Sequence, residues 1–267
     1  MPQGAAGAYA LGMKLTFLGT GTSNGIPVIG CGCSVCCSDD PRDRRTRTSA
    51  LIQIDGKSLL IDTAPELRLQ AVAVGLERVD AVLFTHPHAD HVGGFDDLRR
   101  FNQINQAQIP VYADALTAGN IRQRFAYAFE RPFPFFGGKP DLDLRVFDGP
   151  FEVLGIPVVP FQVGHGSWIV NGFRFGDTVY LTDAKDIPPA SIDAMRGART
   201  LVINALRHHP HPVHLSLDEA LAVIAEIGPE RAYIVHISHE MGPHAAINAT
   251  LPEGVELAYD GLAVECA

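Results

Sequence analysis

The chain has 267 residues, of which 46% are hydrophobic and 19% charged, so it can bury a substantial core and has no disordered or collagen-like bias. Its formal net charge of −9 disfavours a nucleic-acid partner. No apolar run is long enough to cross a bilayer, and no shift in composition divides residues 13–267, so we expect a single domain there.

The first twelve residues, MPQGAAGAYALG, carry no positively charged region and no long apolar segment, so they do not resemble a signal peptide. We expect residues 1–12 to be a disordered leader or cloning remnant, and the protein to be soluble and cytoplasmic. Whether it acts alone or as a homodimer stays open.

Short β-branched or apolar runs with turn-forming flanks predict strands throughout the chain. These runs lie at 14–19, 50–54, 58–62, 81–86, 109–113, 157–163, 168–176, 178–183, 200–206, 231–236 and 256–261. Helical patterns lie at 64–75, 96–106, 115–129 and 216–228. The last helix should begin with a capping box, Ser216 with Glu219.

Strands outnumber helices and do not alternate with them strictly, which favours two packed sheets with helices outside over a doubly wound sheet. The sequence therefore predicts an α/β fold in the form of a four-layer αββα sandwich. Residues 130–150 are rich in Pro, Gly and Phe and predict a long loop of the kind that often borders a site.

The segment LGTGTSNGIP contains a G-x-S-x-G match around Ser23 and the glycines Gly19, Gly21 and Gly25. A serine-hydrolase elbow and a dinucleotide-binding loop both require a helix directly afterwards, and no helix is predicted here. We therefore interpret this segment as a tight turn that ends a strand.

The segment THPHADHVGG at 85–94 follows an apolar strand and places His86, His88, Asp90 and His91 within six residues. A loop after a strand can present such side chains around one point. Neutral imidazole and carboxylate together suit zinc, manganese or iron. The spacing therefore predicts a metal site.

This H-x-H-x-D-H spacing resembles the signature of the metallo-β-lactamase fold. His165, Asp183 and His236 follow in the order of that superfamily's later ligands, each at a predicted strand end. Over nearly all of residues 13–265 the chain resembles the phosphoribosyl cyclic phosphate phosphodiesterases of bacterial phosphonate metabolism. The stretches that carry this resemblance are FLGTGTSNGIPVIGCGCSVC, LLIDTAPELRLQ, GFRFGDTVYLTDA, HPVHLSLDEAL, VHISHE and AYDGL.

The resemblance implies a phosphodiesterase that hydrolyses a small cyclic phosphodiester with two divalent metal ions, manganese or zinc. By analogy, one ion is held by His86, His88 and His165, and the other by Asp90, His91 and His236, with Asp183 bridging both. The ions would activate the attacking water and neutralise phosphoryl charge. His214 lies where relatives carry a histidine that protonates the leaving group, and Asp62 could orient a metal-bound histidine.

Four of the five cysteines lie in CGCSVCC at 31–37, which indicates metal binding rather than disulfides in a reducing compartment. In the phosphodiesterase branch a C-x-C-x-x-C motif forms a structural zinc site with a histidine three residues after the last catalytic ligand. The matching residues are Cys31, Cys33, Cys36 and His239. Cys37 could replace Cys36, and we favour Cys36.

Two alternatives remain within the superfamily. A transfer-RNA 3′-processing endonuclease shares the metal ligands, but the net charge and the sequence ISHEMG around the last ligand speak against it. The second is a metal-binding protein without hydrolase activity, such as the accessory protein of pyrroloquinoline-quinone synthesis. Such a protein would be expected to lack some of the metal ligands, whereas all seven candidates are present here. The roles of His208, His209 and His211 are left open between phosphate contact and exposed surface.

Overall fold

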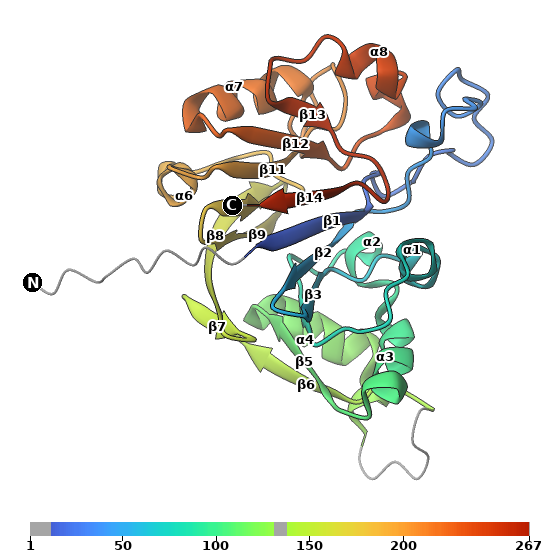
Figure 1. The fold of residues 1–267 in the computed structure, drawn as a ribbon, viewed down its shortest axis with the longest axis vertical. Coiled ribbons are helices and arrows are strands. Elements are labelled where there is room, and N and C mark those ends of the chain that lie inside the picture. Colours follow the sequence, from blue (N-terminus) through green and yellow to red (C-terminus); the bar gives the residue numbers. More distant parts are fainter. Residues whose placement is uncertain (1–11, 131–137, 267) are drawn as a thin grey trace, which may run out of the picture.

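A computed structural model describes residues 12–130 and 138–266, so most of the expected leader at 1–12 lies outside the described residues. Two mixed β-sheets of seven strands each pack face to face, with helices on their outer faces (Figure 1). The predicted four-layer αββα sandwich is confirmed.

The first sheet has the order β14-β1-β2-β3-β4-β5-β6 and the second has the order β13-β12-β11-β10-β9-β8-β7. The strands of the first sheet are β1 (Met13–Gly19), β2 (Ser49–Ile54), β3 (Lys57–Ile61), β4 (Ala81–Leu83), β5 (Ile109–Ala113), β6 (Leu142–Val146) and β14 (Ala263–Cys266). Those of the second are β7 (Phe151–Val153), β8 (Ile156–His165), β9 (Trp168–Phe175), β10 (Thr178–Tyr180), β11 (Thr200–Asn204), β12 (Arg231–Val235) and β13 (Val255–Leu257).

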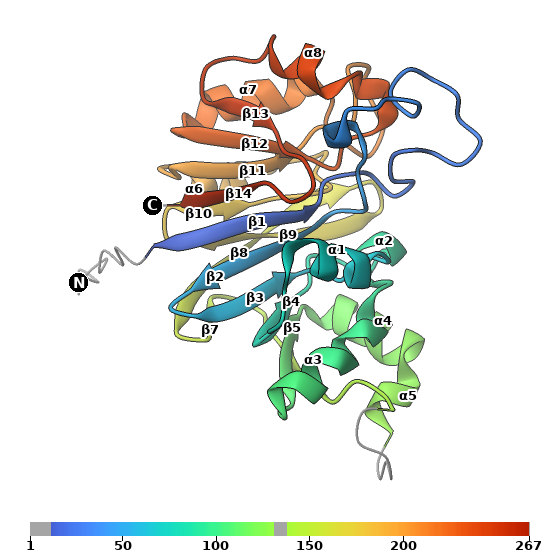
Figure 2. The same ribbon diagram turned by 45° about the vertical axis from the view of Figure 1, so that its right-hand side comes forward.

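The helices divide between the two outer faces (Figure 2). Beside the first sheet lie α1 (Leu67–Val74), α2 (Ala89–Val92), α3 (Leu98–Asn105), α4 (Ala115–Arg124) and α5 (Ala126–Phe129). Beside the second lie α6 (Pro189–Met195), α7 (Leu217–Ile227) and α8 (His244–Asn248). Short 3₁₀ turns form η1 (Pro41–Asp43), η2 (Phe95–Asp97) and η3 (His239–Met241). None of the helices in the described ranges is long and apolar enough to cross a membrane.

Three apolar clusters hold the layers together. The central one joins the facing sides of the two sheets and includes Phe17, Ile52, Phe173 and Val235, all fully buried. The other two lie between each sheet and its helices. Burying a side chain of this size contributes about 1.5–3 kcal/mol, so the stacked sheets form a rigid platform whose strand ends can carry a site.

Most predicted elements are present, with local differences. The loop expected at 130–150 contains strand β6, which pairs in parallel with β5, and residues 131–137 lie outside the described part. The alternation in LDLRV suits an edge strand. The helix expected at 115–129 is divided at Phe125, whose φ of −115° and ψ of 39° are not helical. The capping box of Ser216 and Glu219 is confirmed.

Three residues at or shortly after strand ends have left-handed backbone conformations. They are Asp62 directly after β3 (φ 60°), Asp183 three residues after the end of β10 (φ 55°) and His236 directly after β12 (φ 57°). Non-glycine residues adopt this region at a cost, and such strain is concentrated at functional sites. All three side chains belong to the polar cluster described next.

Candidate metal centre

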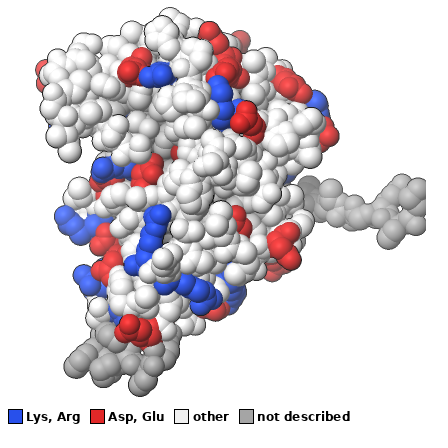
Figure 3. All heavy atoms as spheres, turned by 180° about the vertical axis from the view of Figure 1, so that it is seen from behind, with Lys and Arg blue, Asp and Glu red and all other residues white. Residues whose placement is uncertain are grey.

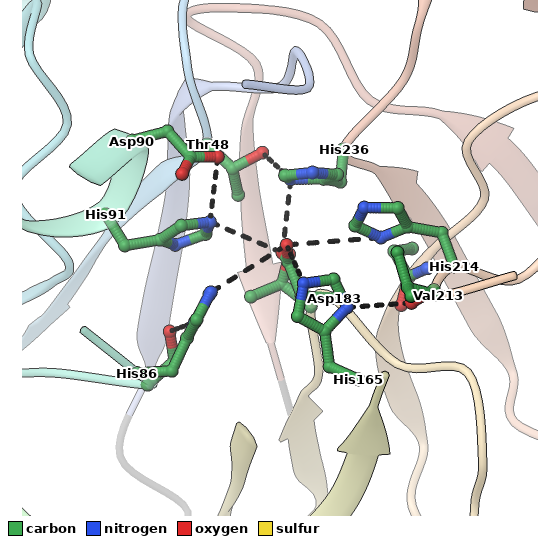
Figure 4. Close-up of polar contacts among 12 residues, drawn as sticks. Thr48, His86, Asp90, His91, His165, Asp183, Val213, His214 and His236 are labelled. Atoms are coloured by element: carbon green, nitrogen blue, oxygen red, sulfur yellow. Dashed lines mark hydrogen bonds and ion pairs between the residues drawn. The ribbon is translucent and has the colours of Figure 1, made fainter. Parts of the chain in front are cut away.

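Asp183 lies at the centre of a buried cluster of imidazoles and carboxylates (Figure 4). Its Oδ1 is 3.1 Å from His236 Nδ1 and 3.4 Å from His91 Nε2. Its Oδ2 is 3.9 Å from the Nε2 atoms of both His86 and His165. Each carboxylate oxygen therefore faces a different set of histidines.

The structure brings all seven predicted ligands of the catalytic metals into two neighbouring groups. Within each group the ligand atoms lie within 4.8 Å of one another. One group is His86, His88 and His165, and the other is Asp90, His91, Asp183 and His236. Each group could hold one divalent ion, with Asp183 in reach of both.

The donors fit metal ions because their free nitrogens point into the cluster. His91 Nδ1 donates to Asp62 Oδ2 at 2.7 Å, and His165 Nδ1 donates to the Val213 carbonyl at 2.7 Å. This leaves each Nε2 facing Asp183. The Nε2 atoms of His86 and His91 are buried and make no hydrogen bond. A buried polar atom without a partner typically costs about 1–3 kcal/mol, and a cation would satisfy these two.

Asp62 holds the loop after β4 in place. Its carboxylate accepts hydrogen bonds from the Thr85 backbone N–H at 2.8 Å and the Thr85 hydroxyl at 2.7 Å, besides that from His91. A carboxylate behind a histidine fixes its tautomer and ring orientation in many metal sites. The orienting role predicted for Asp62 therefore matches its contacts.

The charges of the cluster also favour a cation. Burial lowers the pKa of His91, but the carboxylates of Asp183, Asp90 and Asp62 outweigh burial and raise that pKa well above its usual range, so an ion bound at this ring would take the place of a proton. Burial lowers the pKa of His86 and of His236, so both rings are neutral near pH 7. Neutral imidazole is the form that binds metal.

His214 borders the cluster without joining its hydrogen bonds. Its Nδ1 is buried, makes no hydrogen bond and lies 4.0 Å from Asp183 Oδ2. Burial, together with the nearby His236, lowers the pKa of His214 to about 3. Its distances to His165 and Asp183 would also allow a ligand role. The geometry thus places His214 beside both metal groups.

The other loop histidines lie differently. His211 is near His214, with their ring centroids 5.2 Å apart, whereas His208 Nε2 lies 2.9 Å from the Met241 carbonyl. His209 is exposed. Of the three, only His211 approaches the cluster.

A second group of donors brings together the loop between β1 and β2 and the turn η3, which follows β12. The Sγ atoms of Cys31, Cys33 and Cys36 lie 3.3, 3.4 and 3.5 Å from His239 Nδ1. Three cysteines and one histidine are a donor set typical of structural zinc sites, so this group could hold such an ion. Cys37 is exposed and not part of this group.

Several contacts of the cluster were not apparent from the sequence. The Thr48 hydroxyl lies 3.2 Å from His236 Nδ1, and the Thr22 hydroxyl 3.3 Å from His236 Nε2. Arg124 donates to the Pro87 carbonyl at 2.7 Å, between two predicted ligands. These partners come from distant parts of the chain, so local patterns could not reveal them.

Comparison with known proteins agrees with this geometry. Residues 57–237 match the family model of the Beta-lactamase superfamily domain. A solved structure described as a new diphosphatase from the PhnP family has a TM-score of 0.88 and 40% identity, over 96% of this chain and 98% of that one. The anti-Pycsar protein Apyc1 of Saccharibacillus brassicae is 54% identical over 196 residues, 67% of this chain and 78% of that protein.

An octanoyltransferase of Porphyromonas gingivalis is 41% identical over 255 residues, which cover 94% of this chain. The match spans only 51% of that protein's length, about half. The chain belongs to the β-lactamase superfamily, and its metallo-β-lactamase fold and its likeness to the PhnP-family structure place it in the PhnP-like branch.

Proposed function

We propose that the protein is a phosphodiesterase with two divalent metal ions, manganese or zinc, that hydrolyses a small cyclic phosphodiester. The proposal rests on the orientation of the Asp183 carboxylate between two sets of histidines. Its Oδ1 faces His91 and His236, and its Oδ2 faces His86 and His165. A carboxylate so placed can serve two ions at once.

In this proposal His86, His88 and His165 would hold one ion, and Asp90, His91 and His236 would hold the other, with Asp183 in reach of both. Two such ions would supply an activated water and would neutralise charge on a phosphoryl group. The chain's own contribution is orientation. Asp62 fixes the His91 ring and the Val213 carbonyl fixes the His165 ring, so the donors converge before any ion binds.

His214 would donate a proton to the leaving oxygen. An alkoxide is a poor leaving group unless it is protonated, and a positioned acid contributes about 10²–10⁴-fold in rate. Because burial lowers the pKa of His214 to about 3, the ring must gain its proton together with the anionic ester. A negative charge beside an imidazole favours the protonated form.

Surface charge supports a small substrate over transfer RNA. The net charge is −9, and Figure 3 shows Lys and Arg interspersed with Asp and Glu on the face in view rather than forming a continuous positive strip. Nucleic-acid binding draws its affinity from neutralised phosphates. A non-hydrolytic accessory role is less well supported, because all seven donors are present and converge.

A diphosphatase is the second candidate, because the PhnP-family structure at 40% identity is described as one. The two activities differ in their leaving group. Phosphate leaves more readily than an alkoxide, so a diphosphatase would depend less on an acid at the position of His214.

The deciding experiment is turnover by the manganese-loaded and zinc-loaded protein on a panel of esters. The panel contains ribose cyclic phosphate, nucleoside cyclic phosphates, a bis-aryl phosphodiester, a dinucleoside diphosphate and precursor transfer RNA. We expect the cyclic esters to give the highest kcat/KM. Preference for the diphosphate supports the second candidate, cleavage of precursor transfer RNA supports the endonuclease, and no turnover at all contradicts a hydrolytic function.

A further inference from the structure

The β8–β9 hairpin carries an aromatic side chain to the edge of the metal centre. A two-residue turn, Gly166 and Ser167, joins the strands, and His165 pairs directly with Trp168 across the hairpin. Opposed residues of an antiparallel pair project from the same face of the sheet. Since His165 is a predicted metal ligand, Trp168 lies on the face that carries the site.

Trp168 marks the place where the buried cluster meets solvent. His86, His91 and Asp183 are buried, whereas His88 and Trp168 are only partly buried. The rings of His88 and Trp168 meet edge to face, with centroids 5.1 Å apart and planes at 73°. A Cβ placed on Gly166 would lie only 2.7 Å from Val213 Cγ1, so the hairpin turn and the loop that carries His214 lie side by side.

Packing of the fold does not account for this indole. Trp168 is the chain's only tryptophan, and within the described parts of the chain it belongs to none of the three apolar clusters that hold the layers together. Leaving part of a large apolar side chain in water forgoes favourable burial. Tryptophan in such positions is typical of binding sites, because its rigid ring offers a wide contact area.

We propose that Trp168 determines specificity by stacking against a nucleobase of the substrate. This inference rests on the proposed function and narrows it, since the substrate would be a nucleoside cyclic phosphate rather than a base-free sugar phosphate. The phosphate lies among the metal ligands, and the base extends past His88 to the part of the indole that His88 leaves uncovered. Stacking accepts purines and pyrimidines alike, because every base has a π face.

The test compares two substrates in the wild type and in Trp168→Leu, which keeps apolar bulk but removes the ring. Base–aromatic stacking corresponds to a loss of about 5- to 150-fold in affinity on removal of the ring. We therefore expect kcat/KM for a nucleoside cyclic phosphate to fall by this factor relative to that for ribose cyclic phosphate, mainly through KM. Trp168→Phe should restore much of the ratio.

Ile169→Ala is the matched control, because Ile169 is 45% exposed and neighbouring strand residues point to opposite faces. It should leave the substrate ratio unchanged. The single tryptophan also gives a direct signal, and nucleoside cyclic phosphate should quench its fluorescence while ribose cyclic phosphate should not.

If Trp168→Leu lowers kcat/KM for both substrates equally, or releases metal, Trp168 merely supports His88 and the inference is wrong. If the wild type hydrolyses both esters with no preference for the base, the inference also fails, while the proposed function survives. Absence of turnover on every cyclic ester would instead contradict the proposed function itself.

Discussion

At the scale of single residues, the site depends on histidines whose Nδ1 atom already makes a hydrogen bond. The Nδ1 of His91 bonds to the Asp62 carboxylate at 2.7 Å, and that of His165 to the Val213 carbonyl at 2.7 Å. The Nδ1 of His86 bonds to the Thr85 hydroxyl at 3.0 Å. Their Nε2 atoms then face the cluster without rotation of the ring. Such fixed donors lose little entropy on binding an ion, which favours tight binding.

Substitutions of Asp183 and of His214 should affect metal binding and proton donation separately. Asp183→Ala removes the carboxylate shared by both groups, so we expect loss of bound metal and of phosphodiesterase activity. His214→Ala should keep the metal and lose about 10²–10⁴-fold in rate on alkyl-leaving esters, but far less on an activated aryl ester that needs no acid. Metal analysis by mass spectrometry and steady-state kinetics measure the two effects.

His209→Ala provides the control, since His209 is exposed on the same loop and should behave like the wild type. A metal-free His214→Ala protein would show that His214 is a ligand. Equal losses on alkyl and aryl esters would contradict its role as the acid.

At the scale of elements, backbone hydrogen bonds attach the long loop between β1 and β2 to the segment that follows β12. Backbone hydrogen bonds join Thr22 N–H to the Ile237 carbonyl at 3.1 Å, and Ile237 N–H to the Thr20 carbonyl at 3.0 Å. The cysteine and histidine group lies further along the same two segments. Because Ile237 directly follows His236, this fastening also fixes a predicted catalytic ligand.

Cys31→Ser and His239→Ala should each reduce the zinc content by one ion per chain, because a structural zinc needs all four protein ligands. Cys37→Ser should retain the full content, since Cys37 is exposed and outside the group. The zinc content of these three variants and of Cys36→Ser, which should also lose one ion per chain, tests the ligand assignment. Loss of zinc in Cys37→Ser with retention in Cys36→Ser would show that the ligand assignment is wrong.

The contact between α8 and the β1–β2 loop predicts sensitivity to acid. His244 Nδ1 lies 3.1 Å from Arg45 Nη2, so the ring must be neutral to accept this hydrogen bond. Burial, followed by the charges of Arg45 and Arg42, lowers the pKa of His244 from 6.5 to about 4. Between these values the unfolded chain binds more protons, so the free energy of unfolding falls as pH falls.

Urea unfolding between pH 7 and pH 4 tests this, because His244→Gln removes the titrating group and keeps a hydrogen-bond acceptor. The free energy of unfolding of the variant should fall less steeply with pH than that of the wild type. Parallel curves for the two proteins would contradict the assignment.

At the scale of the whole molecule, the features that could be predicted from the sequence are those carried by short, continuous motifs. The H-x-H-x-D-H spacing and the strand ends at His165, Asp183 and His236 located the donors, because strand ends of stacked sheets meet at one edge. Strand β6 was missed because its residues lie in a segment dominated by Pro and Gly. The contacts of Thr48, Val213 and Trp168 join segments distant in sequence and depend on the folded arrangement.

The most direct test of the account is a crystal structure of the metal-loaded protein with anomalous difference maps. We predict two peaks about 3.5–4 Å apart on either side of Asp183, the spacing of two-metal hydrolases, and a third peak at the Cys31, Cys33, Cys36 and His239 group. A single peak among the histidines, or two peaks without Asp183 between them, would contradict the proposed centre.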